Sequence, residues 1–200
     1  MDTELLVDRR IDDGTKLVAQ LVRDGFNVAV ALWAKTREEG LWFLYIGSDS
    51  FDMKRNLGTA YQKLYFSLRK ISDSSISISD VKLVDSVNPI AQAALRLRAQ
   101  FAGRIPFRSR AQMLGGLAVE EVYIYPELGP MTPTEIMQTV IGLMSRQGFL
   151  QPSQVKLHDG SVIVAVPCGV KTNNNMVQVE VMEPSGVNRS IPLDQIASIQ

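Results

Sequence analysis

Two neighbouring apolar segments limit most strongly what this chain can fold into. Residues 26–35 and 41–48 are each of strand length, and the polar loop 36–40 joins them. Apolar residues occupy both faces of each segment, whereas a hairpin with one solvated face would alternate apolar with polar residues. We therefore expect an antiparallel hairpin at the centre of a sheet, with layers of structure covering both faces.

The loop length also predicts which side chains of this hairpin share a face. One face is predicted to carry Val28, Val30, Leu32, Leu44 and Ile46. The other is predicted to carry Ala29, Ala31, Trp33, Phe43, Tyr45 and Gly47. A slip of one residue would exchange the two faces of one strand, so the assignment depends on the assumed loop. The small residues of the second face would let a helix approach closely.

Four segments have the spacing of apolar residues that is typical of amphipathic helices. They are residues 13–24, 53–71, 88–103 and 132–148. Gly14 marks an expected break before the first of them. Asn88-Pro89 is a typical helix start, and Thr132-Pro133-Thr134-Glu135 has the pattern of a capping box. The second of these segments has apolar and aromatic residues at helical spacing, which are Leu57, Tyr61, Leu64, Tyr65, Leu68 and Ile71.

Further short strands complete the predicted architecture. Residues 81–84 form one, and a second hairpin pairs 107–113 with 117–125 across a Gly115-Gly116 turn. Beyond the fourth helix the pattern is all-β, with strands at 154–157, 161–166, 176–182, 187–191 and 196–199, and turns at 158–160, 169–175 and 183–186. Short strands at this spacing predict a small barrel or curled sheet of the size of an SH3-like unit.

The predicted fold class is therefore α+β: a central mixed or antiparallel sheet flanked by helices, followed by a small all-β unit. Residues 126–134 contain three prolines and a glycine, which is typical of a linker. We expect an α+β sheet-and-helix domain over residues 1–127. A helix with a small β-barrel-like unit is expected over residues 128–200.

Composition narrows the class of protein without naming an activity. The chain is 46% hydrophobic and 21% charged, as ordinary globular proteins are, and its formal net charge is zero. Cys168 is the single cysteine, so no intrachain disulfide can form, and we expect it to be a small packed side chain in a reducing compartment. The polar start of the chain and the lack of a long apolar run predict a soluble cytoplasmic protein without a membrane segment.

The arginines are distributed unevenly along the chain. Residues 86–119 contain no acidic residue but five arginines, which are Arg96, Arg98, Arg104, Arg108 and Arg110. Arginine binds phosphate and carboxylate well, so this cluster is a candidate anion or nucleic-acid site. The second hairpin offers a structural alternative. A two-residue turn would place Arg110 opposite Glu121 and Arg108 opposite Tyr123, where each would make an ordinary cross-strand contact.

Asp80-Val81-Lys82 matches an acid-x-lysine pattern that is found in metal-dependent nucleases. Such a site needs a second acid, and the neighbouring candidates are Asp49 and Asp52. A whole predicted helix separates these acids from Asp80, so the match defines only a weak alternative: a metal-dependent hydrolase that uses Asp80, Lys82 and Asp49.

No other pattern in the chain indicates chemistry. His158 is the single histidine and lies in a predicted turn, and the chain contains neither a phosphate-binding glycine loop nor a cysteine pair. The sequence therefore predicts no cofactor and no metal, and it favours a non-enzymatic interaction or adaptor module. Its partner is expected to be another protein, with nucleic acid as the alternative partner.

Overall fold

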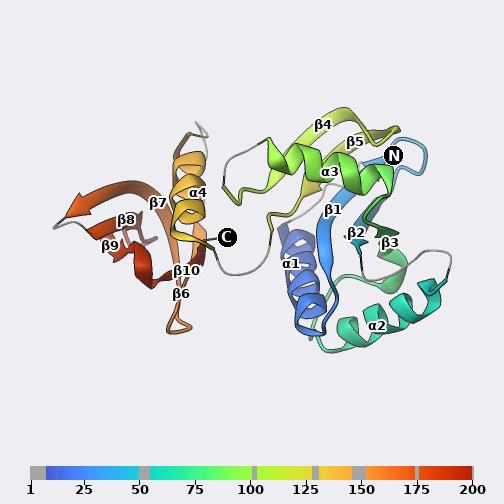
Figure 1. Ribbon diagram of the computed structural model, residues 1–200, viewed down its shortest axis with the longest axis horizontal. Coiled ribbons are helices and arrows are strands. Elements are labelled where there is room, and N and C mark those ends of the chain that lie inside the picture. The colour runs from blue at the N-terminus through green and yellow to red at the C-terminus, as the bar shows by residue number, and fades with distance from the viewer. Residues whose placement is uncertain are drawn as a thin grey trace. The chain divides into compact units, whose positions relative to one another are not determined.

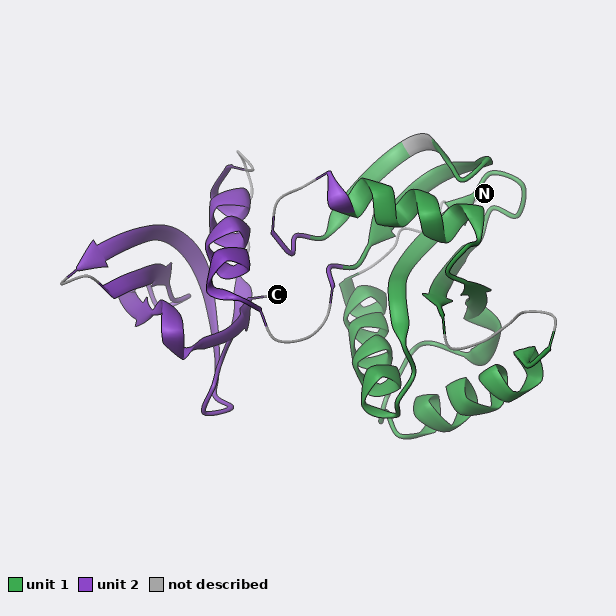
Figure 2. Cartoon of the chain, viewed as in Figure 1, with its two compact units in different colours: residues 1–98, 106–125 green, residues 99–105, 126–200 purple. Residues whose placement is uncertain are grey.

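The computed structural model describes residues 8–49, 55–100, 103–127, 131–145, 152–173 and 176–199. These residues form an α+β fold with four α-helices and two five-stranded sheets, one of which is mixed (Figure 1). The chain divides into two compact units (Figure 2). Unit 1 comprises residues 1–98 and 106–125, and unit 2 comprises residues 99–105 and 126–200. That domains 1–127 and 128–200 fold independently stays a prediction.

Unit 1 holds the mixed sheet and three helices. Its elements are α1 (Asp8–Arg23), β1 (Val28–Thr36), β2 (Trp42–Ser48), α2 (Leu57–Arg69), a 3-10 turn η1 (Ile78–Asp80), β3 (Val81–Asp85), α3 (Pro89–Ala99), β4 (Phe107–Leu114) and β5 (Leu117–Ile124). The strands are ordered β3-β2-β1-β5-β4, and only β2 and β3 pair in parallel. The hairpin of β1 and β2 is therefore central, as predicted.

The predicted register of this hairpin is wrong by one residue. Leu32 pairs with Tyr45 and Ala34 with Phe43, so the face that carries Leu32 does not carry Leu44 and Ile46. Lys35 pairs with Trp42, whereas the predicted loop would pair it with Leu41, and the register shifts again between Val28 and Val30. Both strands are nonetheless almost entirely buried, as their apolar character on both faces predicts.

Helix α3 covers the face that carries Val30, Leu32 and Ala34. The buried side chains of this layer also include Tyr45, Val84, Ile90, Ala91, Ala94, Leu114, Val119, Val122 and Ile124. A Cβ atom at Gly47 would lie 3.1 Å from the Cβ of Ala91, so the glycine lets α3 approach β2 closely. The prediction that small residues admit a helix here is correct for Gly47.

Helices α1 and α2 lie on the opposite face, where α1 contacts β1 and α2 contacts β3 (Figure 1). Gly14 was expected to break the chain before the first helix, but it is a buried residue inside α1. A Cβ atom there would overlap the hydroxyl oxygen of Tyr125. That hydroxyl accepts a hydrogen bond from Trp33 Nε1 at 2.8 Å and donates one to the carbonyl oxygen of Ile11 at 2.8 Å. Gly14 thus permits close packing.

A buried carboxylate fixes α1 to the segment that follows α2. Asp13 is 1% exposed and accepts hydrogen bonds from the Ser75 backbone nitrogen (2.8 Å), the Ser75 hydroxyl (2.7 Å) and Lys16 Nζ (3.0 Å). Burial alone would raise the pKa of Asp13, but these hydrogen bonds outweigh it and lower the pKa from 3.8 to about 2. The ionised form is therefore part of the folded structure.

Replacing Asp13 by Asn is expected to lower the free energy of unfolding at neutral pH by about 1–3 kcal/mol, because Ser75 and Lys16 lose their charged, buried acceptor. Because the pKa of Asp13 is lower in the folded than in the unfolded chain, its carboxylate stabilises the fold above pH 3.8. This stabilisation is lost as the pH falls towards 2 and the carboxylate is protonated. The free energy of unfolding, measured by chemical denaturation at a series of pH values across this range, should therefore change less with pH in the variant than in the parent. The exposed neighbour Asp12, changed to Asn, is the control; equal effects of both changes would contradict the assignment.

The hairpin of β4 and β5 confirms the predicted turn. Gly115 and Gly116 have φ values of 58° and 89°, which a two-residue turn of this kind requires and which glycine adopts readily. The register pairs Arg108 with Tyr123 and Arg110 with Glu121, as the sequence predicts.

Unit 2 holds the fourth helix and the antiparallel sheet. Its elements are α4 (Pro133–Ser145), β6 (Ser153–Leu157), β7 (Val162–Asn173), β8 (Met176–Met182), β9 (Asn188–Pro192), a 3-10 turn η2 (Leu193–Gln195) and β10 (Ile196–Ile199). The capping box is confirmed, because Thr132 N donates to the Glu135 carboxylate at 2.7 Å and Glu135 N donates to Thr132 Oγ1 at 3.3 Å. Helix α4 packs on β7 and β10 around Val140, Val155 and Ile196.

Three predictions for unit 2 need correction. The strand order β10-β6-β7-β8-β9 leaves the described sheet open, so a closed SH3-like barrel is not confirmed. A turn was expected from residue 169, but β7 continues to Asn173 and passes Pro167 with a register shift between Pro167 and Gly169. A bulge of this kind accommodates proline within a strand. Cys168 lies at this bulge and is exposed, so it is not a packed side chain.

Candidate functional site

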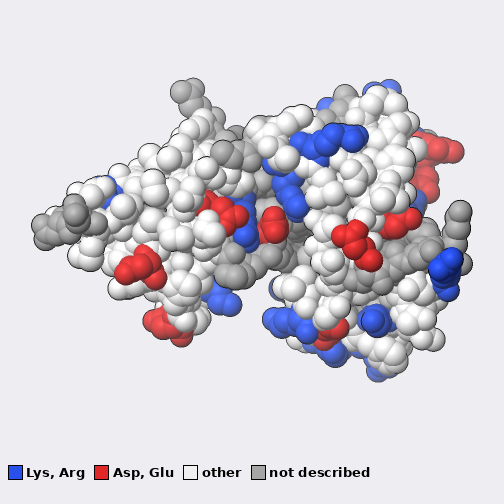
Figure 3. All heavy atoms as spheres, in the orientation of Figure 1, with Lys and Arg blue, Asp and Glu red and all other residues white. Residues whose placement is uncertain are grey.

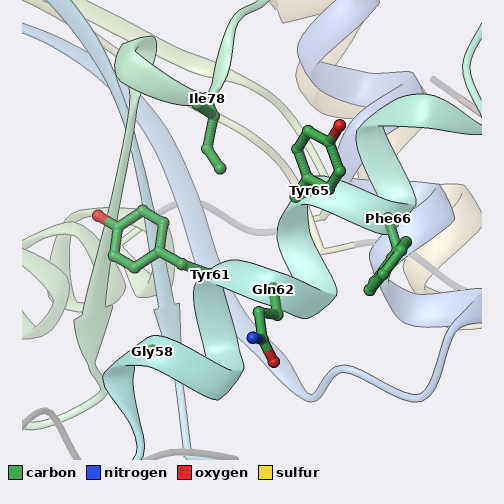
Figure 4. A pocket seen from close by; sticks show the side chains of 6 residues that line it. All are labelled: Gly58, Tyr61, Gln62, Tyr65, Phe66 and Ile78. Atoms are coloured by element: carbon green, nitrogen blue, oxygen red, sulfur yellow. The ribbon is translucent and has the colours of Figure 1, made fainter.

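An aromatic depression on the outer side of α2 is the most distinctive surface of unit 1. It has a volume of about 430 Å³ and is lined by Gly58, Tyr61, Gln62, Tyr65, Phe66 and Ile78, which we call the α2 pocket (Figure 4). Five of these residues come from α2, and Ile78 comes from η1. The exposed fractions are 62% for Phe66, 44% for Tyr65 and 39% for Ile78, which are large values for apolar side chains.

The opposite side of α2 explains why these residues face outward. Ala60, Leu64 and Ser67 are buried. They are spaced by three or four positions, so they form a single stripe along the helix. Tyr65 and Phe66 directly follow Leu64, and each step along a helix rotates the side chain by about 100°. The burial of Leu64 therefore turns Phe66 away from the sheet.

Tyr61 joins the pocket to the edge of the sheet. Its hydroxyl donates to the carbonyl oxygen of Val81 and accepts from the backbone nitrogen of Leu83, both at 3.3 Å. The hydroxyl thus satisfies backbone groups of the edge strand β3 that a neighbouring strand would otherwise use. The ring of Tyr61 is held in place and forms a fixed wall of the α2 pocket.

Other contacts hold the remaining walls of the pocket. The guanidinium of Arg69 lies 5.8 Å from the centre of the Tyr65 ring, and the rings of Tyr65 and Phe66 meet edge to face at 5.8 Å. On the other side, Asp80 accepts hydrogen bonds from the Ser77 backbone nitrogen (2.8 Å) and hydroxyl (2.7 Å), which close the turn that presents Ile78. The pocket is therefore formed by residues that the fold itself positions.

The sequence analysis missed this site. The helical spacing groups Tyr65 with the buried Leu64, yet Tyr65 is exposed, and the sequence assigns no role to Phe66. A signal was present, because Leu64, Tyr65 and Phe66 are consecutive and together span about 200° of the helix surface. One buried stripe cannot hold all three side chains, so at least one large ring had to be exposed.

The arginines of the cluster are divided between the two units. Arg104 belongs to unit 2, where its Nε and Nη2 lie 3.3 and 3.1 Å from Glu135 Oε1. Hydrogen bonds from Thr132 together with this ion pair lower the pKa of Glu135. Arg98 lies on α3 and donates to the carbonyl oxygen of Ala29 at 3.1 Å. Arg96 is exposed on the same helix.

Arg108 and Arg110 share one acidic partner on the neighbouring strand. Arg108 Nε donates to Glu121 Oε1 at 2.6 Å, and Arg110 Nε lies 3.7 Å from Glu121 Oε2. The shorter contact is diagonal across the strand pair, although Arg110 is the residue directly opposite Glu121. Glu121 itself is 8% exposed, so its charge needs these cations. The geometry supports the structural interpretation of these arginines.

Replacing Arg104, Arg108 and Arg110 together by Gln is expected to lower the free energy of unfolding by about 1–3 kcal/mol, since each pair contributes up to about 1 kcal/mol. Chemical denaturation measures this loss. We expect neither the parent nor the variant to bind a labelled oligonucleotide measurably at low salt. Binding by the parent with a log–log salt slope near −0.9 per phosphate contact, flattened in the variant, would support an anion site instead.

Two of the three residues of the hydrolase alternative, Asp80 and Lys82, are engaged in other contacts. Asp80 is bonded to Ser77 and lies 3.4 Å from Arg10, while Lys82 Nζ contacts both carboxylate oxygens of Glu39 at 2.8 and 2.7 Å. Burial alone would lower the pKa of Lys82, but the interactions with Glu39 and Tyr45 outweigh it and raise the pKa.

Asp49 lies at the other end of these strands. Strands β2 and β3 run parallel, with Leu44 beside Val81 and Ser48 beside Asp85. Asp49 follows Ser48, whereas Asp80 precedes Val81, so six residues of strand, about 20 Å, separate the two acids. The second candidate acid, Asp52, lies outside the described residues. Within the part of the chain that the structure describes, no three His, Cys, Asp or Glu side chains gather closely enough to hold a metal ion.

The remaining candidates are ordinary surface features. His158 is exposed in the turn between β6 and β7, and the neighbouring Asp159 accepts hydrogen bonds from the Ser161 hydroxyl and backbone nitrogen, which lower the pKa of Asp159.

Among the described helices, none is long and apolar enough to cross a membrane. No family model matches the chain, and no curated protein or solved structure matches it either.

Proposed function

We propose that this chain is a non-enzymatic protein-interaction module whose partner docks at the α2 pocket. The observation that supports this function is the exposure of Phe66, Tyr65 and Ile78 around one depression. Aromatic side chains are enriched at the centres of protein interfaces, where their burial contributes most of the binding energy. A contiguous apolar surface of this kind on a folded unit is typical of an interaction site.

The alternatives of the sequence analysis have less support. An anion or nucleic-acid site at the arginine cluster would have to compete with the carboxylates of Glu121 and Glu135. A hydrolase site would require Asp80 and Lys82 to leave Ser77 and Glu39. The likeness of unit 2 to an SH3-like unit rests on strand number and length, and the cytoplasmic location rests on the sequence alone, so both remain predictions.

Docking at the α2 pocket can be tested with a displayed library of random peptides selected on the full chain. We expect enriched peptides that bind Phe66→Ala about tenfold to a hundredfold more weakly than the parent, because truncating a central interface aromatic removes about 2 kcal/mol or more. Fluorescence anisotropy with the synthetic peptides gives the dissociation constants. The stability of Phe66→Ala should match that of the parent, since the ring is 62% exposed.

Val87→Ala is the matched control, because Val87 is 75% exposed and lies between β3 and α3, away from the α2 pocket. This variant should bind the selected peptides as the parent does. Peptides that bind Phe66→Ala as tightly as the parent, or a selection without any enriched sequence, would contradict docking at the α2 pocket.

A further inference from the structure

The charged side chains of α2 itself are all basic. Residues 53–72 contain five basic residues and no acidic residue. The basic residues in the described part of this segment are Arg55, Lys63, Arg69 and Lys70. Figure 3 shows several Lys and Arg side chains over α2 and the adjoining end of α1, with an acidic patch among them. The chain as a whole has a net charge of zero, so this asymmetry is local.

Helical spacing places these cations beside the exposed rings. Lys63 precedes Phe66 by three positions and Lys70 follows it by four, so both lie along the same side of α2 as Phe66. Arg69 lies beside Tyr65, with Nη1 3.4 Å from the hydroxyl oxygen. Among the described residues no carboxylate pairs with Lys63, whereas Lys70 contacts Asp24 at 2.6 Å. The apolar opening is therefore bordered by positive charge along the helix.

The nearby acidic groups do not reverse this charge. Asp24 is occupied by Lys70 and by the hydroxyl of Ser67, which lies 2.6 Å away. Asp80 is held by Ser77 and faces Arg10. Carboxylates of a bound segment would thus find Lys63 and Arg69 at the rim, whereas cations of a bound segment would meet repulsion.

We propose that the occupant of the α2 pocket is an acidic peptide segment that carries one aromatic or aliphatic anchor residue. The anchor packs against Phe66, Tyr65 and Ile78, and flanking Asp or Glu side chains pair with Lys63 beside Phe66 and with Arg69 beside Tyr65. This inference rests on the proposed function and adds to it the chemical class of the partner. Charge at the rim mainly selects the partner and speeds its association, while the buried anchor contributes most of the affinity.

Single-stranded nucleic acid is the competing occupant, because it too combines negative charge with rings that stack. Such binding uses a basic groove that follows several nucleotides, with an aromatic platform for successive bases. In the described structure, the rings that line the α2 pocket belong to one depression, and two of them pack edge to face against each other. One depression accommodates one anchor, so the geometry favours the peptide.

The test uses three labelled peptides of about 12 residues, a length that spans a helical groove. The first has a central Phe flanked by Glu and Asp, the second has Lys in place of every acid, and the third has Gly in place of Phe. We expect the full chain to bind the first peptide at least about tenfold more tightly than either of the others, as measured by fluorescence anisotropy. Raising the salt from about 50 to about 200 mM should weaken the binding.

Charge reversal supplies the second measurement. Lys63→Glu should bind the acidic peptide about fivefold to tenfold more weakly and should gain affinity for the basic peptide. Lys156→Glu is the matched control, because Lys156 is an exposed lysine on β6 of unit 2. This variant should leave both affinities unchanged. Because Lys63 is exposed on α2, the change to Glu is expected to leave the fold intact.

Two results would overturn the acidic partner while leaving docking at the α2 pocket in place. One is equal affinity for the acidic and basic peptides, with both still weakened by Phe66→Ala. The other is tighter binding of an oligothymidylate of about 12 nucleotides than of the acidic peptide, again weakened by Phe66→Ala. If no probe of any charge distinguishes the parent from Phe66→Ala, the proposed function fails together with this inference.

Discussion

Replacing Gly14 by Ala is expected to lower the free energy of unfolding by about 2–4 kcal/mol, although alanine is the better helix former by about 1 kcal/mol. The added Cβ would overlap the Tyr125 hydroxyl oxygen and lie 2.9 Å from its Cζ. The overlap forces α1 away from the sheet or breaks the hydrogen bonds of Tyr125 to Trp33 and Ile11. Thermal denaturation should show a fall of about 10 °C in Tm.

Gly58→Ala is the matched control for this substitution. Gly58 also lies in a helix, but a Cβ atom there has no neighbour within 4 Å, so the change should be neutral or slightly stabilising. The double variant Gly14→Ala, Tyr125→Phe removes the overlapping oxygen and should be less destabilised than the sum of the single variants. A Gly14→Ala protein as stable as the parent would show that α1 does not pack on Tyr125 in this way.

Placing a carboxylate on either face of the central hairpin is expected to abolish soluble folding. Val30 is 1% exposed on the face covered by α3, and Ile46 is fully buried on the face of α1 and α2. An unpaired buried charge costs several kcal/mol, against a total stability of about 5–15 kcal/mol. Val30→Asp and Ile46→Asp should therefore lose the native circular dichroism spectrum and accumulate in the insoluble fraction.

Leu41→Asp is the control in the same hairpin, since Leu41 directly precedes β2 and is 55% exposed. The free energy of unfolding of this variant should stay within about 0.5 kcal/mol of the parent's, which is the range that surface substitutions show. A soluble Val30→Asp or Ile46→Asp protein with the parent's denaturation midpoint would contradict the central position of the hairpin.

The features that the sequence predicted correctly depend on interactions within a few residues. Gly115-Gly116 defines the turn and thereby the pairs Arg108–Tyr123 and Arg110–Glu121, because few other residues adopt positive φ at both positions. The start of α4 follows from the three-residue reach between Thr132 and Glu135. The apolar character of both faces of residues 26–48 requires cover on both sides, whatever the covering elements are.

The features that the sequence did not predict depend on contacts between distant segments. From the sequence alone Gly14 is interpreted as a helix break. In the structure it is needed because the hydroxyl of Tyr125, more than a hundred residues later, lies against it. The register of β1 and β2 changes with a single loop residue, and the bulge near Val28 adds a further shift that periodicity does not encode.

The α2 pocket likewise depends partly on local sequence and partly on contacts between distant segments. The sequence predicts an amphipathic helix in this region, which the structure has at Leu57–Arg69, with more large apolar side chains than one stripe can bury. Only the tertiary structure decided which ring is exposed, because the sheet and α1 select the side of α2 that carries Ala60 and Leu64. Local periodicity defines the stripes of a helix, but the free energy of burying one stripe depends on the surface that meets it, and distant segments form that surface.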